Sequence, residues 1–408
     1  MKKSLWAIGV IVVLLLIVWG GTFAYQNLRG IGPAIKNPPV DITNTGGTST
    51  SSPSGSSLPL KLPSEFGIEI FAKDLPGARV MKFDQAGNMW ISQTSKGTVS
   101  MLQISGGKVI GQNTTFKNLK RPHGLAFDPT NPNILYIAEE DKITRTNLAT
   151  DGPPTFEKIA DLPSGGGHFT RTIAFGPDDR LYVSIGSSCN VCNESDDRRA
   201  KIFLMRRDGS DFKEYARGLR NAVFFAWNYV DGKMWATENS RDLLGDNIPP
   251  DEINIVEAGK NYGWPICYGK NIHDDNFDKN TYIRNPCMAP FETPSHVDIQ
   301  AHSAALGLAF IPEEGWPDGY GNDLLVAYHG SWNRSTPTGY KVVRMKLDNN
   351  GNHQSTEDFI TGWLTGANSA ASALGRPVDI MAVPGGTAYI SDDKAGVIYR
   401  VFLKQEAR

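Results

Sequence analysis

The chain has 408 residues, of which 40% are hydrophobic and 10% aromatic, so it can bury a large core. Its formal net charge is −2 at pH 7 and its pI is near 6.4, which argues against the strong basic excess of a nucleic-acid-binding protein. With 42 glycines and 25 prolines the sequence is rich in turns, and this composition favours many short strands over helices.

The N-terminal segment predicts a membrane anchor. An almost wholly apolar run over residues 5–25 follows Lys2 and Lys3 and is long enough to cross a bilayer as a helix. Cleavable signal peptides have shorter apolar regions, so we expect an uncleaved anchor with the rest of the chain on the extracytoplasmic side. Cleavage would instead give a secreted protein. Residues 26–62, rich in Gly, Ser, Thr and Pro, predict a flexible linker.

From residue 63 to 408 one pattern recurs six times: an apolar strand, a turn of Asp, Gly, Pro or Asn, and a second strand with an aromatic residue. Six such repeats predict an all-β domain folded as a six-bladed β-propeller. The strand that begins at Gly67 is expected to close the ring beside residues 396–403. The stretch from Cys267 to His302 could hide a seventh unit, but its Pro and Asn content favours a loop. The repeats begin at Ala78, Pro122, Arg171, Val223, Leu306 and Pro377.

A basic side chain stands near the start of the first strand in every repeat. The loops that enter the innermost strands of a propeller line one mouth of its channel, so we expect these side chains to surround a pocket for a small polyanionic ligand. Each could instead be a solvated loop charge or a structural histidine, and Arg79 is interpreted as an ordinary loop charge. The six residues are Arg79, His123, His168, Arg220, His302 and Arg376.

Two further features point to chemistry. Three glycines lead into His168, which leaves the imidazole uncrowded, and histidine is the natural general base near neutral pH. Residues 236–265 are dense in Asp, Glu and Asn, whose hard oxygen ligands suit calcium, although the spacing is not that of an EF-hand.

The four cysteines leave several interpretations open. Cys189 and Cys192 form a C-x2-C pattern that suits half of a zinc site, a redox pair or a short disulfide, whereas Cys267 and Cys287 stand 20 residues apart. Outside the cytoplasm disulfides are the default. We therefore favour structural disulfides that pair 189 with 192 and 267 with 287.

The order of these motifs resembles a known family. The His168 stretch is followed by SSCNVCNESDDRRA, GLRN, RDLLGDNIPPDEIN, GKNYGWPICYG and HGSWNR. Over about residues 63–405 this succession is similar to the sorbosone dehydrogenase branch of the pyrroloquinoline quinone (PQQ) sugar dehydrogenases, relatives of the soluble glucose and aldose sugar dehydrogenases. The resemblance implies that PQQ lies over the channel mouth with a calcium ion against the quinone.

The resemblance also implies roles for individual residues. His168 matches the base that takes the proton from the anomeric hydroxyl while hydride passes to the quinone, and Arg220 would polarise the quinone carbonyl together with calcium. The calcium loop departs from the Gly-Pro pair of the soluble glucose enzymes. The expected cofactor-binding residues are His123, His168, Arg220, Asn221, Arg334 and Arg376, and the expected calcium ligands are Glu238, Asn239, Ser240 and Asp251.

The predicted function is oxidation of an aldose or a related, sorbosone-like sugar aldehyde. The predicted partners are this sugar or aldehyde, the membrane through the N-terminal helix and an unidentified electron acceptor, with no nucleic acid. Two alternatives remain: a calcium-dependent propeller lactonase, which would place several Asp, Glu and Asn side chains on the channel axis, and a non-catalytic propeller that binds sugar or protein.

Overall fold

The computed structural model describes residues 13–20, 59–150, 152–366 and 369–404. Residues 13–20 are helical, and the rest of the anchor predicted over residues 5–25 lies outside the described residues. Within the described part, no helix is both long and apolar enough to cross a membrane, so the transmembrane helix is not confirmed. The predicted linker over residues 26–62 lies outside the described residues as far as residue 58.

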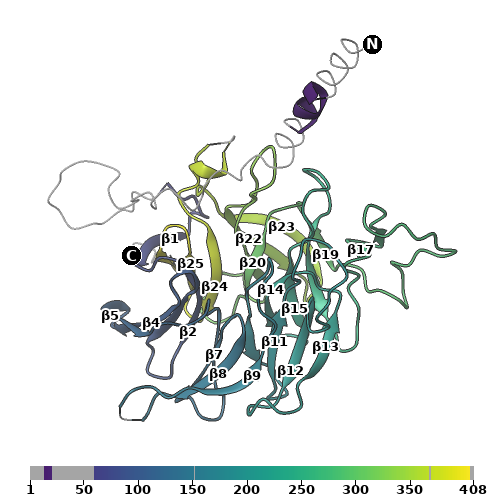
Figure 1. The fold of residues 1–408 in the computed structure, drawn as a ribbon. Helices are drawn as coiled ribbons and strands as arrows, with labels where there is room; N and C mark the ends of the chain where they lie inside the picture. Colours follow the sequence, from purple (N-terminus) through teal and green to yellow (C-terminus); the bar gives the residue numbers. More distant parts are fainter. Residues whose placement is uncertain (1–12, 21–58, 151, 367–368, 405–408) are drawn as a thin grey trace, which may run out of the picture.

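Six four-stranded antiparallel sheets form the body of the protein, which confirms the predicted six-bladed propeller (Figure 1). Blade one contains β2 (Ala78–Phe83), β3 (Met89–Gln93), β4 (Thr98–Ser105) and β5 (Lys108–Phe116). Blade two contains β6 (Gly124–Phe127), β7 (Ile134–Ala138), β8 (Lys142–Asn147) and β9 (Glu157–Asp161). Blade three contains β10 (Ile173–Phe175), β11 (Leu181–Ile185), β12 (Lys201–Met205) and β13 (Lys213–Arg217).

The second half of the ring repeats the plan with longer loops. Blade four contains β14 (Ala222–Trp227), β15 (Met234–Glu238), β16 (Asp251–Val256) and β19 (Val297–Ile299). Blade five contains β20 (Ala305–Phe310), β21 (Leu324–Tyr328), β22 (Lys341–Leu347) and β23 (His353–Ile360). Blade six contains β24 (Pro377–Val383), β25 (Thr387–Asp392), β26 (Val397–Leu403) and β1 (Phe66–Ala72). Two 3-10 turns, η1 (Thr94–Lys96) and η2 (Ala370–Ser372), lie between strands.

Strand β1 closes the ring, as predicted. It is the outermost strand of blade six and pairs antiparallel with β26, from Phe66 opposite Leu403 to Ala72 opposite Ile398. The segment before β1 also belongs to the ring, because Leu60 packs in the core of blades five and six and Lys61 bridges Thr361. The described end of the predicted linker, residues 59–62, is therefore part of the propeller.

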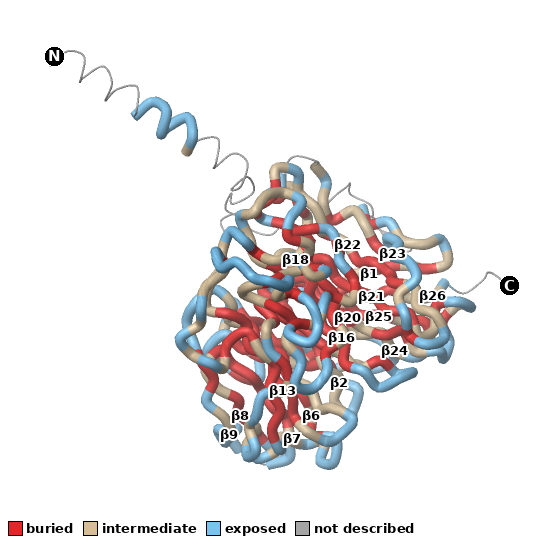
Figure 2. Tube along the Cα trace, turned by 90° about the vertical axis from the view of Figure 1, so that its right-hand side faces the viewer, coloured by how far each residue is buried: buried red, intermediate tan, exposed pale blue. Residues whose placement is uncertain are grey.

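Burial rises from the rim toward the interior of each blade (Figure 2). Strands β3, β11 and β21 are buried at every position, whereas the outer strands β9 and β23 are mostly exposed. The inner strands β6 and β20 approach the next blade so closely that a Cβ on Gly124 would lie 2.4 Å from the Arg171 carbonyl, and one on Gly307 2.5 Å from the Val378 carbonyl. This close approach around the axis holds the start of each inner strand in a fixed place.

Hydroxyl side chains tie neighbouring blades together beneath the channel mouth. Ser92 donates to the His123 carbonyl at 2.8 Å, Thr237 to the Leu306 carbonyl at 2.8 Å and Ser391 to the Arg79 carbonyl at 2.6 Å. Thr172 makes the corresponding bond to Val223. Each bond runs to the next blade, so hydrogen bonds between blades stabilise the loops that carry the basic residues.

A long excursion leaves blade four between β16 and β19. It contains the two-residue strands β17 (Cys267–Tyr268) and β18 (Ile272–His273), which pair with each other, and it projects from the side of the ring (Figure 1). We call residues 263–296 the arm. The arm ends by supplying β19 as the outer strand of blade four, so the stretch from Cys267 to His302 is an insertion rather than a seventh blade.

Candidate active site

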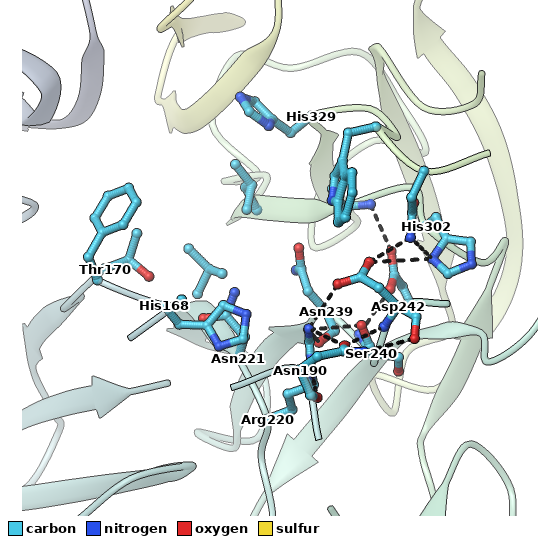
Figure 3. Close-up of a pocket in the computed structure, with 18 of the residues that line it drawn as sticks. His168, Thr170, Asn190, Arg220, Asn221, Asn239, Ser240, Asp242, His302 and His329 are labelled. Carbon is cyan, nitrogen blue, oxygen red and sulfur yellow. Dashed lines mark hydrogen bonds and ion pairs between the residues drawn. The ribbon is translucent and has the colours of Figure 1, made fainter. Parts of the chain in front are cut away.

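A cavity of about 540 Å³ lies over the channel, where the loops that enter the inner strands meet (Figure 3). Five of the six basic residues identified in the repeats line it: Arg79, His168, Arg220, His302 and Arg376. The sixth, His123, does not line this cavity. It is fully buried with its ring against Phe224, and burial lowers its pKa well below the usual range, so the predicted contact between His123 and a cofactor is not supported.

The interpretation of Arg79 as an ordinary loop charge is wrong. Arg79 is the second residue of β2, is 8% exposed and forms an ion pair with Asp393 at 2.7 Å. Asp393 follows β25, a strand of the neighbouring blade, so no local pattern around Arg79 indicates this partner. The pairing is created by ring closure.

His168 has its Nδ1 atom 2.9 Å from both the carbonyl and the hydroxyl of Ser187. A carbonyl can only accept, so Nδ1 carries the proton and the Nε2 lone pair remains available on the cavity side. Burial, and next the charge of Arg220, lower the pKa of His168 to about 3. The imidazole is therefore neutral at physiological pH and able to accept a proton.

Arg220 is 4% exposed and uses every guanidinium N–H within the protein. Its Nε donates to the Asn190 carbonyl at 2.8 Å, and Nη1 donates to the carbonyls of Asn239 and Ser240 at 2.8 and 2.9 Å. Its Nη2 donates to the Asn190 side chain at 2.9 Å and to Asp242 at 3.0 Å. Arg220 thus holds three loop segments together at one edge of the cavity.

Three of the four predicted calcium ligands line the cavity: Asn239, Ser240 and Asp251. The fourth, Glu238, lies behind them. It is 4% exposed and accepts the Asn221 backbone N–H at 2.9 Å. Burial, and then the neighbouring Glu252, raise the pKa of Glu238 well above its usual range. Since Glu238 does not line the cavity, its position does not support the predicted contact with a calcium ion bound there.

Asp251 is buried, and both oxygens of its carboxyl accept backbone N–H groups. Its carboxyl accepts the N–H of Ser240 at 3.0 Å and that of Ala304 at 2.7 Å, which joins the predicted calcium loop to the start of blade five. Burial raises the pKa of Asp251 to about 7. The carboxyl orients the Asn239–Ser240 carbonyls and leaves few lone pairs for a metal.

Asp242 is the carboxylate that the sequence-based assignment missed. It lines the cavity with 19% of its side chain exposed, accepts from Arg220 and receives the Asn333 amide at 2.7 Å. The His302 Nδ1 lies 3.9 Å away, and His302 donates its Nε2 proton to the Gly245 carbonyl at 2.8 Å. Both Asp242 and Asn333 stand in stretches that the sequence analysis singled out, but nothing local in either stretch distinguishes them from their neighbours.

The opposite wall is cationic. His329 donates Nε2–H to Asp393 at 3.0 Å, and burial, and next the charge of Arg376, lower the pKa of His329 to about 4. Burial acts to raise the pKa of Asp393, but His329 and Arg79 hold it below its usual range. Arg376 donates Nε to the His329 carbonyl at 3.1 Å and Nη2 to the Gly330 carbonyl at 2.5 Å, which leaves Nη1 without an acceptor in the described part of the chain.

Two other predicted cofactor residues have different places. Asn221 lines the cavity beside His168 (Figure 3). Arg334 does not line it: its guanidinium donates to the carbonyls of Thr336, Asp246 and Ala301 and to the Asn247 side chain. Arg334 fastens the long loops of blades four and five to each other, so the predicted cofactor contact is not supported by its position.

Both predicted disulfides are present, Cys189–Cys192 and Cys267–Cys287. Cys189 belongs to the lining of the cavity, whereas Cys267 and Cys287 do not. The zinc alternative is thereby excluded for these thiols, because a disulfide sulfur carries no thiolate to bind the metal.

Fold and site together define a six-bladed propeller with a polar, cation-lined cavity over its channel. Residues 60–404 match the TrAA12-like family, and the chain belongs to this family. An uncharacterized protein of Borreliella burgdorferi is 32% identical over 363 residues, which cover 85% of this chain and 91% of that protein.

Relatives with assigned names are more distant. The PQQ-dependent pyranose dehydrogenase of Coprinopsis cinerea is 25% identical over 390 residues, with 79% of this chain matched. The match spans about half of that enzyme's length, 51%. The PQQ-dependent sugar dehydrogenase of Hypocrea jecorina is 24% identical over 315 residues and covers 64% of this chain and 71% of that enzyme.

Solved structures show the same fold. The calcium structure of a Trichoderma reesei carbohydrate-active enzyme of family AA12 has a TM-score of 0.73 at 19% identity and covers 87% of this chain and 100% of that one. The holo PQQ domain of the Coprinopsis cinerea pyranose dehydrogenase has a TM-score of 0.70 at 19% identity and covers 86% and 98%. The resemblance to PQQ sugar dehydrogenases is confirmed, and the predicted PQQ and calcium agree with the cofactors named for these relatives.

Proposed function

We propose that this protein is a quinoprotein that oxidises an aldose or a related, sorbosone-like sugar aldehyde, with PQQ and calcium in the cavity over the channel and His168 as the general base. One observation carries the proposal. A neutral imidazole with a free Nε2 faces a cavity whose opposite wall offers guanidinium donors that no described protein group accepts.

The residues present fit the cofactor. PQQ is a planar anion with several carboxylates and adjacent carbonyl groups, and carboxylates pair well with guanidinium groups. Arg376 retains a free Nη1, and the buried Nε of Arg79 has no partner among the described residues. The cavity volume of about 540 Å³ lies in the range of small-molecule sites.

The oxygen-rich edge fits calcium. The carbonyls of Asn239 and Ser240 and the partly exposed carboxylate of Asp242 are hard ligands close together at one side of the cavity. A calcium ion there would act as a Lewis acid toward a carbonyl oxygen of the cofactor. When bound, PQQ supplies an ortho-quinone that accepts hydride.

His168 takes the proton of the substrate hydroxyl at Nε2. The Ser187 carbonyl, which accepts from Nδ1, stabilises the imidazolium that forms and fixes the orientation of the ring. Before reaction, burial and next the charge of Arg220 lower the pKa of the imidazole, so that it is neutral and able to accept a proton. The hydrogen bond to the Ser187 carbonyl and the lowered pKa of His168 therefore support the role of a general base.

We assign Arg220 a positioning role. All of its N–H groups donate to protein acceptors, so direct contact with the cofactor would require one of those bonds to break. By holding the Asn239 and Ser240 carbonyls and the Asp242 carboxylate, Arg220 arranges the oxygen atoms that we assign to calcium.

We also propose that the propeller works on the extracytoplasmic side, anchored by the segment over residues 5–25. Two disulfides support this location, because disulfides persist in oxidising compartments. Protease added outside intact cells should degrade an anchored propeller there, whereas a propeller protected until lysis would contradict the location.

Reconstitution tests the activity. Purified chain is mixed with PQQ and calcium, and sugar-dependent reduction of ferricyanide is followed. We expect turnover with at least one aldose that requires both additions. No change in the PQQ absorption spectrum and no turnover with any aldose would overturn the proposal, and lactone hydrolysis that needs calcium but no quinone would favour a lactonase.

A further inference from the structure

We propose that a second cavity, which lies between blades three and four and the arm, binds a small aromatic quinone that serves as the electron acceptor of the enzyme. The second half of this statement rests on the proposed dehydrogenase function. The first half, binding of an aromatic ring with carbonyl acceptors, stands on the cavity itself. We call this space the arm cavity; its volume is about 990 Å³.

The arm cavity has two sides. On the ring side it is lined by residues 199–201, which lead into β12, and by residues 217–218, at the end of β13. On the other side it is covered by residues 281–284 and by Pro286, Phe291 and Glu292, all in the arm that projects beside β17 (Figure 1). Cys192 and Cys267, one from each disulfide, belong to its lining, so both disulfides hold its walls in place.

Its walls carry an unusual amount of apolar surface. Five large apolar or aromatic residues of the arm belong to this lining: Trp264, Pro265, Ile266, Ile283 and Phe291. Phe291 is 65% exposed and Ile283 fully exposed, although both are large apolar side chains. Exposed apolar groups gathered around a cavity commonly mark a binding site, and these suit a flat hydrophobic ring.

Three buried polar groups around the same cavity have no partner among the described residues. They are the Trp264 Nε1, the Arg199 Nη1 and both carboxyl oxygens of Glu292. Arg199 is 5% and Glu292 4% exposed. Buried polar atoms are normally satisfied, and each one left unsatisfied is costly, so a ligand that pairs with them is favoured.

Each of these three groups can donate a hydrogen bond at neutral pH, and only the Glu292 carboxyl can also accept one. Trp and Arg side chains can only donate, and burial, with a smaller effect from Glu252, raises the pKa of Glu292 to about 8, so its carboxyl keeps a proton. Donors without acceptors select a ligand that carries acceptor oxygens. Apolar walls together with such donors fit an aromatic quinone better than a sugar, whose many hydroxyl groups need acceptors as well.

The arm cavity lies back to back with the active-site cavity. The disulfide Cys189–Cys192 has Cys189 in the lining of the active site and Cys192 in that of the arm cavity. Two residues along the chain, Gly218 lines the arm cavity and Arg220 the active site. The two spaces therefore have neighbouring walls, and we infer that a quinone bound in the arm cavity receives electrons from the active site across them.

The overall reaction balances. The sugar loses two electrons and two protons when its C–OH becomes C=O, and the quinone gains two electrons and two protons when it becomes the hydroquinone. The active-site cofactor returns to its oxidised form in the cycle. The acceptor is thus a second substrate with a site of its own.

A binding measurement without PQQ tests the cavity. 2-Methyl-1,4-naphthoquinone is titrated into the purified chain in a calorimeter, with 2-methylnaphthalene as the analogue that lacks carbonyl oxygens. We expect saturable binding of the quinone and at least about tenfold weaker binding of the hydrocarbon, since the donors would then remain unpaired. Equal affinity for both, or no quinone binding, would overturn the proposal.

Two variants locate the binding. Trp264→Phe keeps the aromatic wall but removes a donor, and Phe291→Ala removes part of the arm wall; each should weaken quinone binding about threefold to tenfold. Ile110→Ala, at an equally exposed apolar residue on β5, is the matched control and should leave the affinity unchanged. Unaltered binding in both cavity variants would place the ligand elsewhere and contradict the proposal.

A kinetic experiment separates this inference from the proposed function. In the PQQ-loaded enzyme, Phe291→Ala should raise the KM for the naphthoquinone several-fold and leave the rate with ferricyanide unchanged. Sugar turnover with ferricyanide but none with the naphthoquinone would overturn the acceptor role alone. Quinone binding without sugar turnover in any acceptor would support the cavity and overturn the dehydrogenase assignment together with the acceptor role.

Discussion

The two walls of the active-site cavity use their arginines in opposite ways. On the wall of blades three and four, every N–H of Arg220 meets a protein acceptor. On the wall of blades one and six, Arg376 and Arg79 each keep a nitrogen without a partner among the described residues. In the first wall, which we call the saturated wall, all arginine donors are paired and fix the geometry of the loops. In the second, which we call the open wall, unpaired arginine donors can bind an anion. Residue type alone does not reveal this difference.

Replacing the proposed base should have the largest effect. His168→Ala should lower kcat by about 100-fold to 10,000-fold, the usual contribution of a general base, because Nε2 no longer accepts the hydroxyl proton. Steady-state rates measured with ferricyanide check this. Thermal stability and PQQ binding should stay close to those of the parent, and a variant that binds PQQ yet keeps full activity would remove His168 from the mechanism.

A substitution in the saturated wall, at Arg220, should mainly lower the stability of the chain. Arg220→Met removes the donor to the Asp242 Oδ2 atom and to three backbone carbonyls, so we expect a loss of about 3 kcal/mol in the free energy of unfolding. Urea denaturation of the chain without cofactor measures it. Arg180→Met, which breaks the exposed pair with Asp211, is the control and should cost less than about 1 kcal/mol.

A substitution in the open wall, at Arg376, should mainly lower the affinity for PQQ. Arg376→Met removes a charged donor to a cofactor carboxylate, so PQQ affinity should fall about 10-fold to 100-fold, as expected for one hydrogen bond to a charged group. Spectroscopic titration with PQQ measures this loss. The opposite pattern, in which Arg376→Met mainly destabilises the chain and Arg220→Met mainly weakens PQQ, would break the comparison.

Each hydrogen bond between a hydroxyl side chain and the next blade should contribute less to the free energy of unfolding than Arg220 does. Thr237→Val removes a buried hydroxyl that donates to the Leu306 carbonyl, so we expect a loss of about 1 kcal/mol in the free energy of unfolding. Thr144→Val is a close control, because the Thr144 hydroxyl is buried without a partner among the described residues. That change should be neutral or stabilising, and equal losses in both variants would contradict the role of the blade ties.

The pH dependence of stability tests the burial of His168 rather than a substitution in either wall. The pKa of His168 is about 3 in the folded chain, below the ordinary value of 6.5, so the unfolded chain binds more protons between these pH values. Stability should therefore fall as the pH drops from 6.5 toward 3. Urea midpoints at pH 7 and pH 4.5 should differ less in His168→Ala than in the parent, whereas equal differences would contradict the lowered pKa.

Much of the fold could be predicted because its evidence is local. Each blade repeats an apolar strand, a turn and a second strand, and the period of that pattern indicates a propeller without knowledge of the tertiary structure. The closing strand from Gly67 followed from the need to complete the last blade, and the disulfide pairs were favoured because disulfides are the default outside the cytoplasm. The convergence of five basic residues was predictable for the same reason, since equivalent loops of a ring meet at one mouth.

The assignments that the positions of the residues do not support depend on the direction in which a side chain points. Arg334 and Glu238 stand within a few residues of true cavity residues, yet one fastens two loops and the other is buried behind them. His123 is fully buried among neighbouring blades, whereas Arg79 turns into the cavity because Asp393 of another blade holds it. Asp242 was passed over among many acidic residues of one loop.

By itself, then, the sequence determined the number of blades, the strand that closes the ring and the covalent cross-links, because these depend on patterns within a few dozen residues. Only the tertiary structure decided which arginine is saturated and which is open, because the acceptors come from other blades. It also brought the arm against blades three and four, where Trp264, Glu292 and Arg199 surround one cavity. Unpaired donors become visible only after every partner has been placed.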